Sequence, residues 1–177
     1  MRESKKFRKI IYDPDALEAW VRDNYEDIYV YCYCNVRNRE DAQDITQNVF
    51  LSFLSSLGRY VEYGKLKNYL FVIARNKIKD HWKKTATLPT DEDWMRDRAE
   101  DLFSETQIVE KMDILESIAS LGESDRELIV LRYYQGLTIK GIAAITGKPA
   151  STIRYAIKRA EARLRFKIEG IEKWTQE

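Results

Sequence analysis

The C-terminal segment "SLGESDRELIVLRYYQGLTIKGIAAITGKPASTIRYAIKRAEARLRFKI" carries start and stop signals that divide it into short helices. Ser124 is a residue type that caps a first helix, and Thr138 is one that caps a second. Gly147 and Pro149 then force a tight turn, after which a third helix starts near Ser151. A short helix, a turn with glycine and a longer helix together predict a helix-turn-helix.

The third of these helices concentrates positive charge, because residues 148–167 hold seven basic residues and one acid. A narrow apolar stripe runs along it, formed by Ile153, Ile157, Ala160, Leu164 and Ile168. This stripe is expected to leave exposed, near the helix start, Arg154, Tyr155, Lys158 and Arg159, and Ser151 and Thr152 lie at the helix N-terminus. The second helix of a helix-turn-helix enters the DNA major groove N-terminus first, where hydroxyls and free backbone N–H groups donate to phosphates. A solvated amphipathic helix is the alternative. Because turn and stripe occur together, we predict DNA contact that is weak and salt-sensitive.

Charge is distributed unevenly along the 177 residues, although the whole chain has a net charge of only +1. Residues 1–84 carry +4, residues 85–106 carry −5 and residues 107–177 carry +2. Neither flanking block shows the alternating apolar pattern of strands, and glycine and proline total only ten. We therefore predict an all-α protein with two small helical domains, at residues 10–84 and 107–170. A flexible acidic linker, residues 85–106, joins them.

Several functional classes are disfavoured by what the sequence lacks. Two cysteines and one histidine cannot supply the four ligands of a structural zinc site, and no phosphate loop, HExxH motif or nucleophile elbow is present. We expect no enzyme, no metal and no cofactor. Cys32 and Cys34 would lie about 200° apart on a helix, which favours packing residues over a redox pair. With no long apolar run and no signal peptide, we expect a cytoplasmic protein without membrane insertion.

Residues 41–57 have the periodicity of an amphipathic helix. At about 100° per residue, one broad side is apolar and is expected to form core: Ala42, Ile45, Val49, Phe50, Phe53, Leu54 and Leu57. The opposite side collects Asp41, Asp44, Gln47, Asn48 and Leu51. An exposed leucine beside acids is a candidate contact point, although single exposed leucines are common and need no function.

Residues 65–84 form a second amphipathic helix with a basic face. Residues 59–84 hold eight basic residues against two acids, and Tyr60 and Tyr63 precede the helix in a short loop. Basic residues interleaved with aromatics suit single-stranded nucleic acid, because phosphates need cations and unstacked bases need flat surfaces. The alternative is a solvated basic face over an aromatic core.

Three motifs in this order resemble the extracytoplasmic-function (ECF) sigma factors, small subunits of bacterial transcription initiation with sigma regions 2 and 4. They are "REDAQDITQNVFLSFL" at residues 39–54, "LKNYLFVIARNKIKDHWKK" at residues 66–84, and "DRELIVLRYYQGLTIKGIAAITGKPASTIRYAIKRAEARL" at residues 125–164. The ordered set, separated by a linker, covers most of the chain.

The resemblance implies a role for each surface. Core RNA polymerase would be contacted by Asp41, Asp44, Gln47, Asn48 and Leu51. The melted minus-ten element would be held by Tyr60, Tyr63, Lys67, Asn68, Arg75, Lys79, Trp82 and Lys83. The duplex minus-thirty-five element would be read from residue 151 onward, and RNA synthesis would belong to the polymerase. Many members of the family are inhibited by an anti-sigma factor, so such a regulator is a further expected partner.

The chain also departs from the family's pattern. Gln43 and Asn48 stand where acids are common, and "TIKGIAA" lacks the acid often found at Lys140 or Gly141. Tyr155 and Ala156 stand where a serine and an arginine are frequent, which leaves the exact promoter sequence open but not the expectation of DNA binding. Two rival hypotheses remain at this point: a helix-turn-helix regulator that acts without polymerase, and an interaction module that no longer binds DNA.

Overall fold

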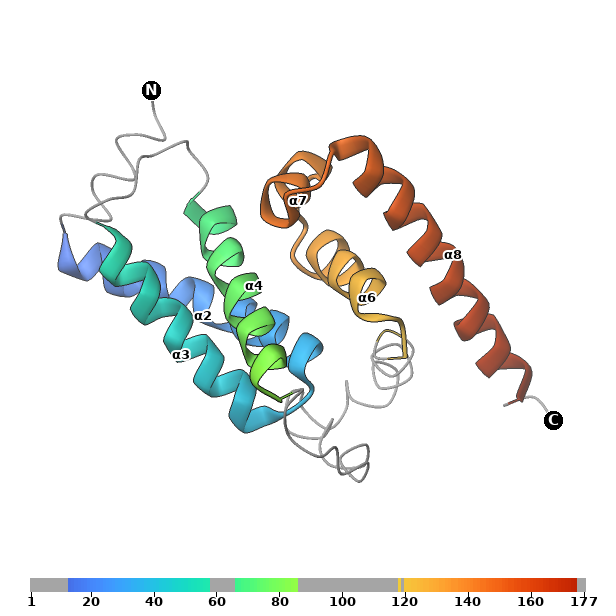
Figure 1. The fold of residues 1–177 in the computed structure, drawn as a ribbon, viewed down its shortest axis with the longest axis horizontal. Helices are drawn as coiled ribbons and strands as arrows, with labels where there is room; N and C mark the ends of the chain where they lie inside the picture. The colour runs from blue at the N-terminus through green and yellow to red at the C-terminus, as the bar shows by residue number, and fades with distance from the viewer. Residues whose placement is uncertain (1–12, 58–65, 86–117, 119, 175–177) are drawn as a thin grey trace.

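The computed structural model describes residues 13–57, 66–85, 118 and 120–174, and their regular elements are helices (Figure 1). A first group contains α2 (Pro14–Val36), α3 (Arg39–Ser56) and α4 (Leu66–Thr85). A second group contains α6 (Glu123–Ile129), the π-helical turn η3 (Val130–Tyr134), α7 (Ile139–Thr146) and α8 (Ala150–Trp174). The all-α prediction is confirmed for this part of the chain. Nearly all of the predicted acidic linker lies outside the described residues.

The first two helices form a hairpin whose ends are set by local chemistry. The Asp13 carboxylate accepts hydrogen bonds from the backbone N–H groups of Asp15 and Ala16, both at 3.2 Å, and so caps α2. The chain reverses at Arg37, which has a left-handed φ of 58°. The Asn38 side chain then accepts from the Asp41 N–H at 3.0 Å and starts α3. Two caps around one left-handed residue thus place α3 back against α2.

The predicted apolar side of α3 forms much of the first group's core. Val49 and Phe53 are fully buried, and the Phe53 ring stacks on Trp20 of α2 with ring centroids 5.0 Å apart. Leu54 was expected in this core but is 40% exposed. It lies at the edge of the stripe, one residue or about 100° from Phe53, where α2 and α4 no longer cover the helix. The apolar stripe is therefore narrower than the sequence indicates.

The second group contains the predicted helix-turn-helix, with one error in its capping. The prediction that Ser124 caps the first helix is wrong, because α6 starts at Glu123 after Gly122 and has no side-chain cap. The Thr138 cap is confirmed: its Oγ1 accepts from the Gly141 N–H at 3.1 Å. Gly147, with a φ of 71°, ends α7, and α8 begins three residues later. That left-handed φ is one that glycine adopts readily.

The two groups pack against each other through one continuous core. α7 contacts α4 and α6 contacts α2, so the second group lies alongside the first (Figure 1). Buried side chains from both groups belong to a single hydrophobic cluster, which includes Tyr31, Leu70 and Phe71 from the first and Leu131 and Ile142 from the second. The sequence left this arrangement open.

The two cysteines behave as packing residues. Cys32 is fully buried, Cys34 is half-buried, and neither forms a disulfide. Burial raises the pKa of Cys32 to about 12 and the pKa of Cys34 to about 11. The prediction of packing residues in place of a bridged pair is confirmed. Among the described helices, none combines the length and apolarity needed to span a membrane.

Candidate nucleic-acid interface

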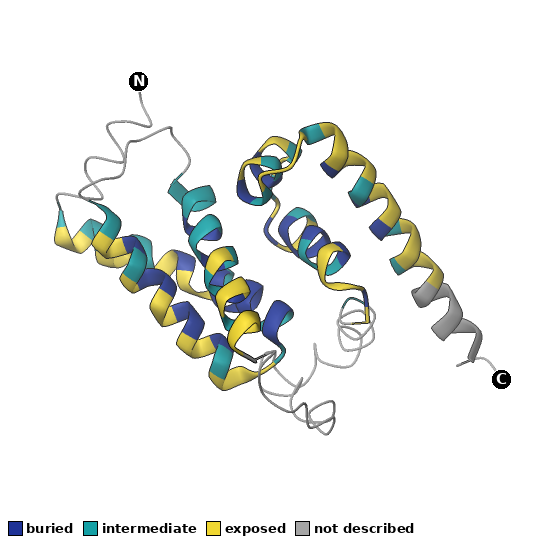
Figure 2. Ribbon diagram, viewed as in Figure 1, coloured by how far each residue is buried: buried dark blue, intermediate teal, exposed yellow. Residues whose placement is uncertain are grey.

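The start of α8 presents a contiguous polar and basic surface. The six residues predicted to contact duplex DNA are all exposed: Ser151, Thr152, Arg154, Tyr155, Lys158 and Arg159. Ile153 and Ile157 are buried on the other side, as the stripe predicted, and their packing fixes which face of α8 points outward (Figure 2). The first backbone N–H groups of a helix have no partner within it, so hydroxyls and free N–H groups converge at this end.

The turn before α8 is held by a small network around Thr146. The Thr146 hydroxyl donates to the Ile142 carbonyl at 2.8 Å and accepts from the Lys148 N–H at 3.4 Å. The Ile153 N–H donates to the Pro149 carbonyl at 3.0 Å, which closes the first turn of α8. These bonds fix the direction of α8 relative to α7. A rigid turn is what a helix-turn-helix needs to present one face to a groove.

A buried carboxylate on α6 bonds to two arginines of α8, and the sequence did not predict this contact. Asp125 on α6 is only 3% exposed and accepts from Arg159 at 3.1 Å and from Arg163 at 2.5 Å. Arg159 and Arg163 are one helical turn apart, so both reach the same group. Arg159, predicted to face DNA, is thus engaged within the protein, while Arg154 and Lys158 have no such tie among the described contacts. The sequence signal for this contact was an acid, Asp125, together with two arginines at i, i+4 spacing, Arg159 and Arg163.

The outer face of α3 is exposed as its periodicity predicted. Asp44, Gln47 and Asn48 are exposed, and Leu51 is 64% exposed. Asp41 is half-buried, with its Oδ2 3.7 Å from Nε2 of His81 on α4. The Asn48 amide donates to the Asp44 carbonyl at 2.8 Å. Together with Leu54, which the sequence placed in the core, Leu51 forms a small apolar patch among polar side chains.

The basic face of α4 is divided into an exposed C-terminal end and a start that contacts α2. Lys79, Trp82 and Lys83 are exposed, with Lys83 within 3.5 Å of Asp80 on the same helix. Lys67 instead donates to Asp27 of α2 at 2.6 Å. Tyr60 and Tyr63 lie outside the described residues, and Phe71 is fully buried. The structure therefore brings together only part of the predicted basic and aromatic surface.

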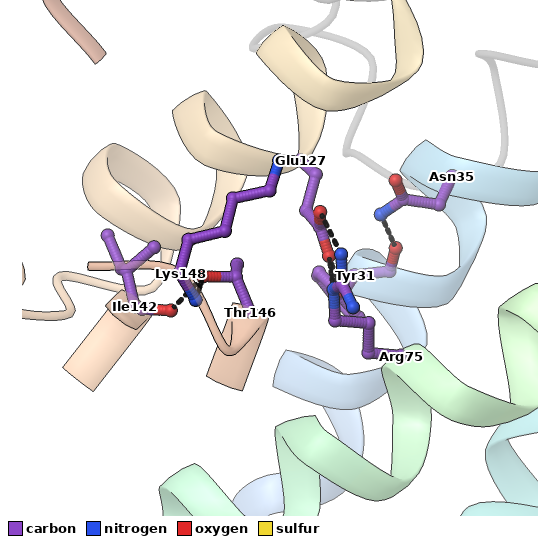
Figure 3. Close-up of polar contacts among 7 residues, drawn as sticks. All are labelled: Tyr31, Asn35, Arg75, Glu127, Ile142, Thr146 and Lys148. Atoms are coloured by element: carbon purple, nitrogen blue, oxygen red, sulfur yellow. Dashed lines mark hydrogen bonds and ion pairs between the residues drawn. The ribbon is translucent and has the colours of Figure 1, made fainter. Parts of the chain in front are cut away.

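Arg75, predicted to hold a DNA strand, contacts the second group of helices. Its Nε donates to Oε1 of Glu127 on α6 at 2.7 Å, and Tyr31 of α2 donates to the same oxygen at 2.7 Å (Figure 3). The Arg75 and Glu127 side chains are 15% and 13% exposed. Burial, followed by the Glu127 charge, raises the pKa of Tyr31 well above its ordinary value, so its hydroxyl is a permanent donor here.

Two family models match the chain, and they divide it as the two helical groups do. Sigma-70 region 2 matches residues 20–87, and sigma-70 region 4 matches residues 111–164. The chain is 33% identical over 143 residues to the ECF RNA polymerase sigma factor ShbA of Streptomyces griseus, covering 74% of this chain and 73% of that protein. The chain belongs to the ECF RNA polymerase sigma factors. It is therefore a transcription-initiation factor.

Other relatives agree with this assignment of the sigma factor. It is 30% identical over 152 residues to the ECF RNA polymerase sigma factor BldN of Streptomyces coelicolor, covering 80% of this chain and 58% of that protein. The fold is similar to that of the sigma factor RpoE of Bartonella quintana, solved with the anti-sigma factor NepR. There the TM-score is 0.74 at 19% identity, with 86% of this chain and 96% of that chain covered. Two helical domains are thus the fold of this sigma factor.

Proposed function

We propose that this sigma factor binds core RNA polymerase, directs it to promoters by reading the duplex minus-thirty-five element with the start of α8, and helps to hold the melted minus-ten element. The observation that carries the proposal is the exposed face of α8 behind the fixed turn at Gly147. Catalysis of RNA synthesis belongs to the polymerase in this scheme.

The chemistry of α8 divides its contacts into two kinds. Ser151, Thr152 and the free N–H groups of the first turn donate to phosphates and set the register of the helix on the duplex. Arg154 and Tyr155 lie at the next exposed positions, where side chains reach base edges in the major groove. Lys158 adds a phosphate contact. Arg159, held by Asp125, contributes charge and the orientation of α8.

The minus-ten element is held by the exposed C-terminal end of α4. Lys79 and Lys83 supply cations, and Trp82 supplies a flat surface for an unpaired base. Tyr60 and Tyr63, outside the described residues, complete this surface in the proposal. Lys67, Asn68 and Arg75 continue it along the helix toward α7.

Core polymerase docks on the outer face of α3. Polar contacts come from Asp44, Gln47 and Asn48. Leu51, whose side chain is exposed in this structure, provides an apolar contact. Asp41 lies at the edge of this surface, and Leu54 extends its apolar part.

The same exposed patch is the surface that we propose an anti-sigma protein covers. Recovery of the sigma factor from native cells without any such bound protein would contradict that partner.

Run-off transcription with paired variants tests the promoter-reading role of α8. The double variant Arg154→Ala, Lys158→Ala should lose start sites that depend on the sigma factor, because it removes two α8 contacts. The matched control is Arg22→Ala, which removes an exposed arginine on α2 whose partner among the described residues is Glu18, one turn away. Equal transcript profiles for the two variants would refute promoter reading by α8 and favour an interaction module.

A further inference from the structure

Tyr155 lies at the centre of the exposed face of α8. At about 100° per residue, it stands about 200° from each of the buried residues Ile153 and Ile157, and it therefore projects away from the core. Its side chain is 71% exposed. Within the part of the chain that the structure describes, no hydrogen bond or ion pair engages it. The ring is thus available to whatever α8 approaches.

The side chains that surround Tyr155 on this face are polar or charged. Ser151 and Thr152 lie one turn before it, and Lys158 and Arg159 lie one turn after it. All four stand within about 60° of Tyr155 around the helix. The first three of them are the proposed phosphate contacts, and Arg159 is held by Asp125. Tyr155 therefore supplies the large apolar group at the centre of a polar surface.

A second exposed aromatic side chain lies too far along α8 to share this role. Phe166 is 80% exposed, but it lies about 16 Å from Tyr155 along the helix axis. A helix that enters the major groove N-terminus first brings its first turns to the bases. Burial of an aromatic ring there is most favourable against another apolar group. The apolar group that base pairs present in the major groove is the C5 methyl of thymine.

From this placement, we propose that Tyr155 is a specificity-determining residue that reads a thymine of the minus-thirty-five duplex through the C5 methyl group of that base. The inference rests on the proposed function and narrows a base-edge contact to one kind of base. The ring packs on the methyl group, and the phenol hydroxyl at its tip keeps a hydrogen-bonding partner in water or on the DNA backbone. Tyr155 stands where a serine is frequent in the family, and a serine side chain is too short for this apolar contact.

Removal of single methyl groups from DNA tests the reading directly. Selection from a library of random duplexes, with the chain alone and with core RNA polymerase, first gives the preferred sequence. Each thymine of that duplex is then replaced in turn by deoxyuridine, which lacks only the C5 methyl. Burial of one such group is worth about fourfold in affinity, so the wild-type chain should lose about fourfold at one position. Loss at no position would overturn the proposal.

Two substitutions of Tyr155 assign the effect to its ring. Tyr155→Ser should bind the thymine and deoxyuridine duplexes equally, and Tyr155→Phe, which keeps the ring but lacks the hydroxyl, should keep the fourfold loss. Tyr134→Ser, which removes a 47% exposed tyrosine on η3, is the matched control and should also keep it. Circular dichroism checks that each variant is helical. Full sensitivity in Tyr155→Ser, or lost sensitivity in Tyr155→Phe, would overturn contact between ring and methyl.

A methyl group added to cytosine gives an independent test at the same position. In a duplex with cytosine in place of the sensitive thymine, 5-methylcytosine restores a methyl group on the major-groove edge. The wild-type chain should bind the methylated duplex about fourfold more tightly than the unmethylated one. Tyr155→Ser should bind both equally. Equal binding of both by the wild-type chain would contradict recognition of the methyl group.

Failure of the proposed function has a separate signature. If duplexes are selected but the chain directs no core-dependent transcript, the promoter role fails, whereas the deoxyuridine series still decides the role of Tyr155. If transcripts appear and no thymine responds to loss of its methyl group, the promoter role stands and the reading by Tyr155 is overturned. If neither form of the protein selects any duplex, sequence reading by α8 fails and the Tyr155 proposal fails with it.

Discussion

Asp125 on α6 accepts a hydrogen bond of 2.5 Å from Arg163 on α8, and its side chain is only 3% exposed. A second bond from Arg159 engages the other carboxylate oxygen. α8, which carries the proposed DNA surface, is therefore oriented by the buried carboxylate of Asp125, which does not itself lie on that surface. This relationship gives the first testable prediction.

Asp125→Asn should destabilise the fold by about 1.5–3 kcal/mol, because it removes hydrogen bonds between charged groups. Duplex DNA binding should weaken as well, since α8 loses its anchor. Urea denaturation followed by circular dichroism measures the stability. Ser124→Ala, an exposed neighbour without a capping bond in this structure, should stay within about 0.5 kcal/mol of wild type. Equal stability of the two variants would contradict the anchor.

Gly147→Ala should destabilise the helix-turn-helix by about 1–2 kcal/mol, because a β-carbon is unfavourable at a φ of 71°. The space around Gly147 is open, so the effect isolates backbone conformation from steric contact. Thermal unfolding measures the change, with Lys148→Ala at the next, exposed position as control. A neutral Gly147→Ala variant would show that the turn does not need the left-handed conformation.

Removal of Lys158, the proposed phosphate contact, should flatten the salt dependence of duplex binding, whereas removal of Arg154 or Tyr155, the proposed base contacts, should not. Each lost phosphate contact lowers the slope of log affinity against log salt by about 0.9, whereas loss of a base contact leaves the slope unchanged. Fluorescence anisotropy at several salt concentrations gives the slope for Arg154→Ala, Lys158→Ala and Tyr155→Ala. We expect a smaller slope for Lys158→Ala and an unchanged slope for Arg154→Ala and Tyr155→Ala. A slope that Lys158→Ala leaves intact would exclude Lys158 from phosphate binding.

Leu51→Glu should weaken binding to core RNA polymerase by at least about tenfold while leaving stability nearly unchanged. The side chain is 64% exposed in the monomer, so the folded chain gains little from it, but an apolar interface would bury it. Ala19→Glu on α2 introduces the same charge at another exposed helical site. If both variants bind core equally well, the outer face of α3 is not the docking surface.

The native thiols should be unreactive toward a thiol reagent at pH 8. Burial raises the pKa of Cys32 to about 12 and the pKa of Cys34 to about 11, from an ordinary value of 9.0, so both stay protonated in the folded state. Because the pKa of each thiol is raised in the folded state, its contribution to stability is fully present below the ordinary pKa of 9.0. That contribution is lost as the pH rises toward 11–12. Labelling should therefore appear on unfolding or in strong alkali. Rapid labelling of the folded protein at pH 8 would contradict this burial.

Periodicity predicted those features that depend on neighbouring residues. The outward face of α3, the stripe of α8 and the Thr138 cap all follow from spacing along one helix, and the described residues confirm them. Leu54 was misplaced because the width of a buried stripe depends on the neighbouring helices. Ser124 was misplaced because a capping residue type shows only that a cap is possible.

Contacts between the two helical groups could not be predicted in the same way. Arg75 and Glu127 are 52 residues apart, and Tyr31 and Glu127 are 96 apart. From the sequence, Arg75 lies on a basic face and is expected to be available for DNA. The three-dimensional structure shows that the Glu127 carboxylate of the other helical group lies beside it. Asp125 was missed for the same reason, since its partners lie 34 and 38 residues further along the chain.

Run-off transcription with purified core RNA polymerase on a library of genomic fragments, with and without the sigma factor, tests the central claim most directly. We predict defined start sites that appear only when the chain is added, with two shared upstream elements when those sites are aligned. Duplex binding without any new start site would contradict promoter direction and would favour a regulator that acts without polymerase.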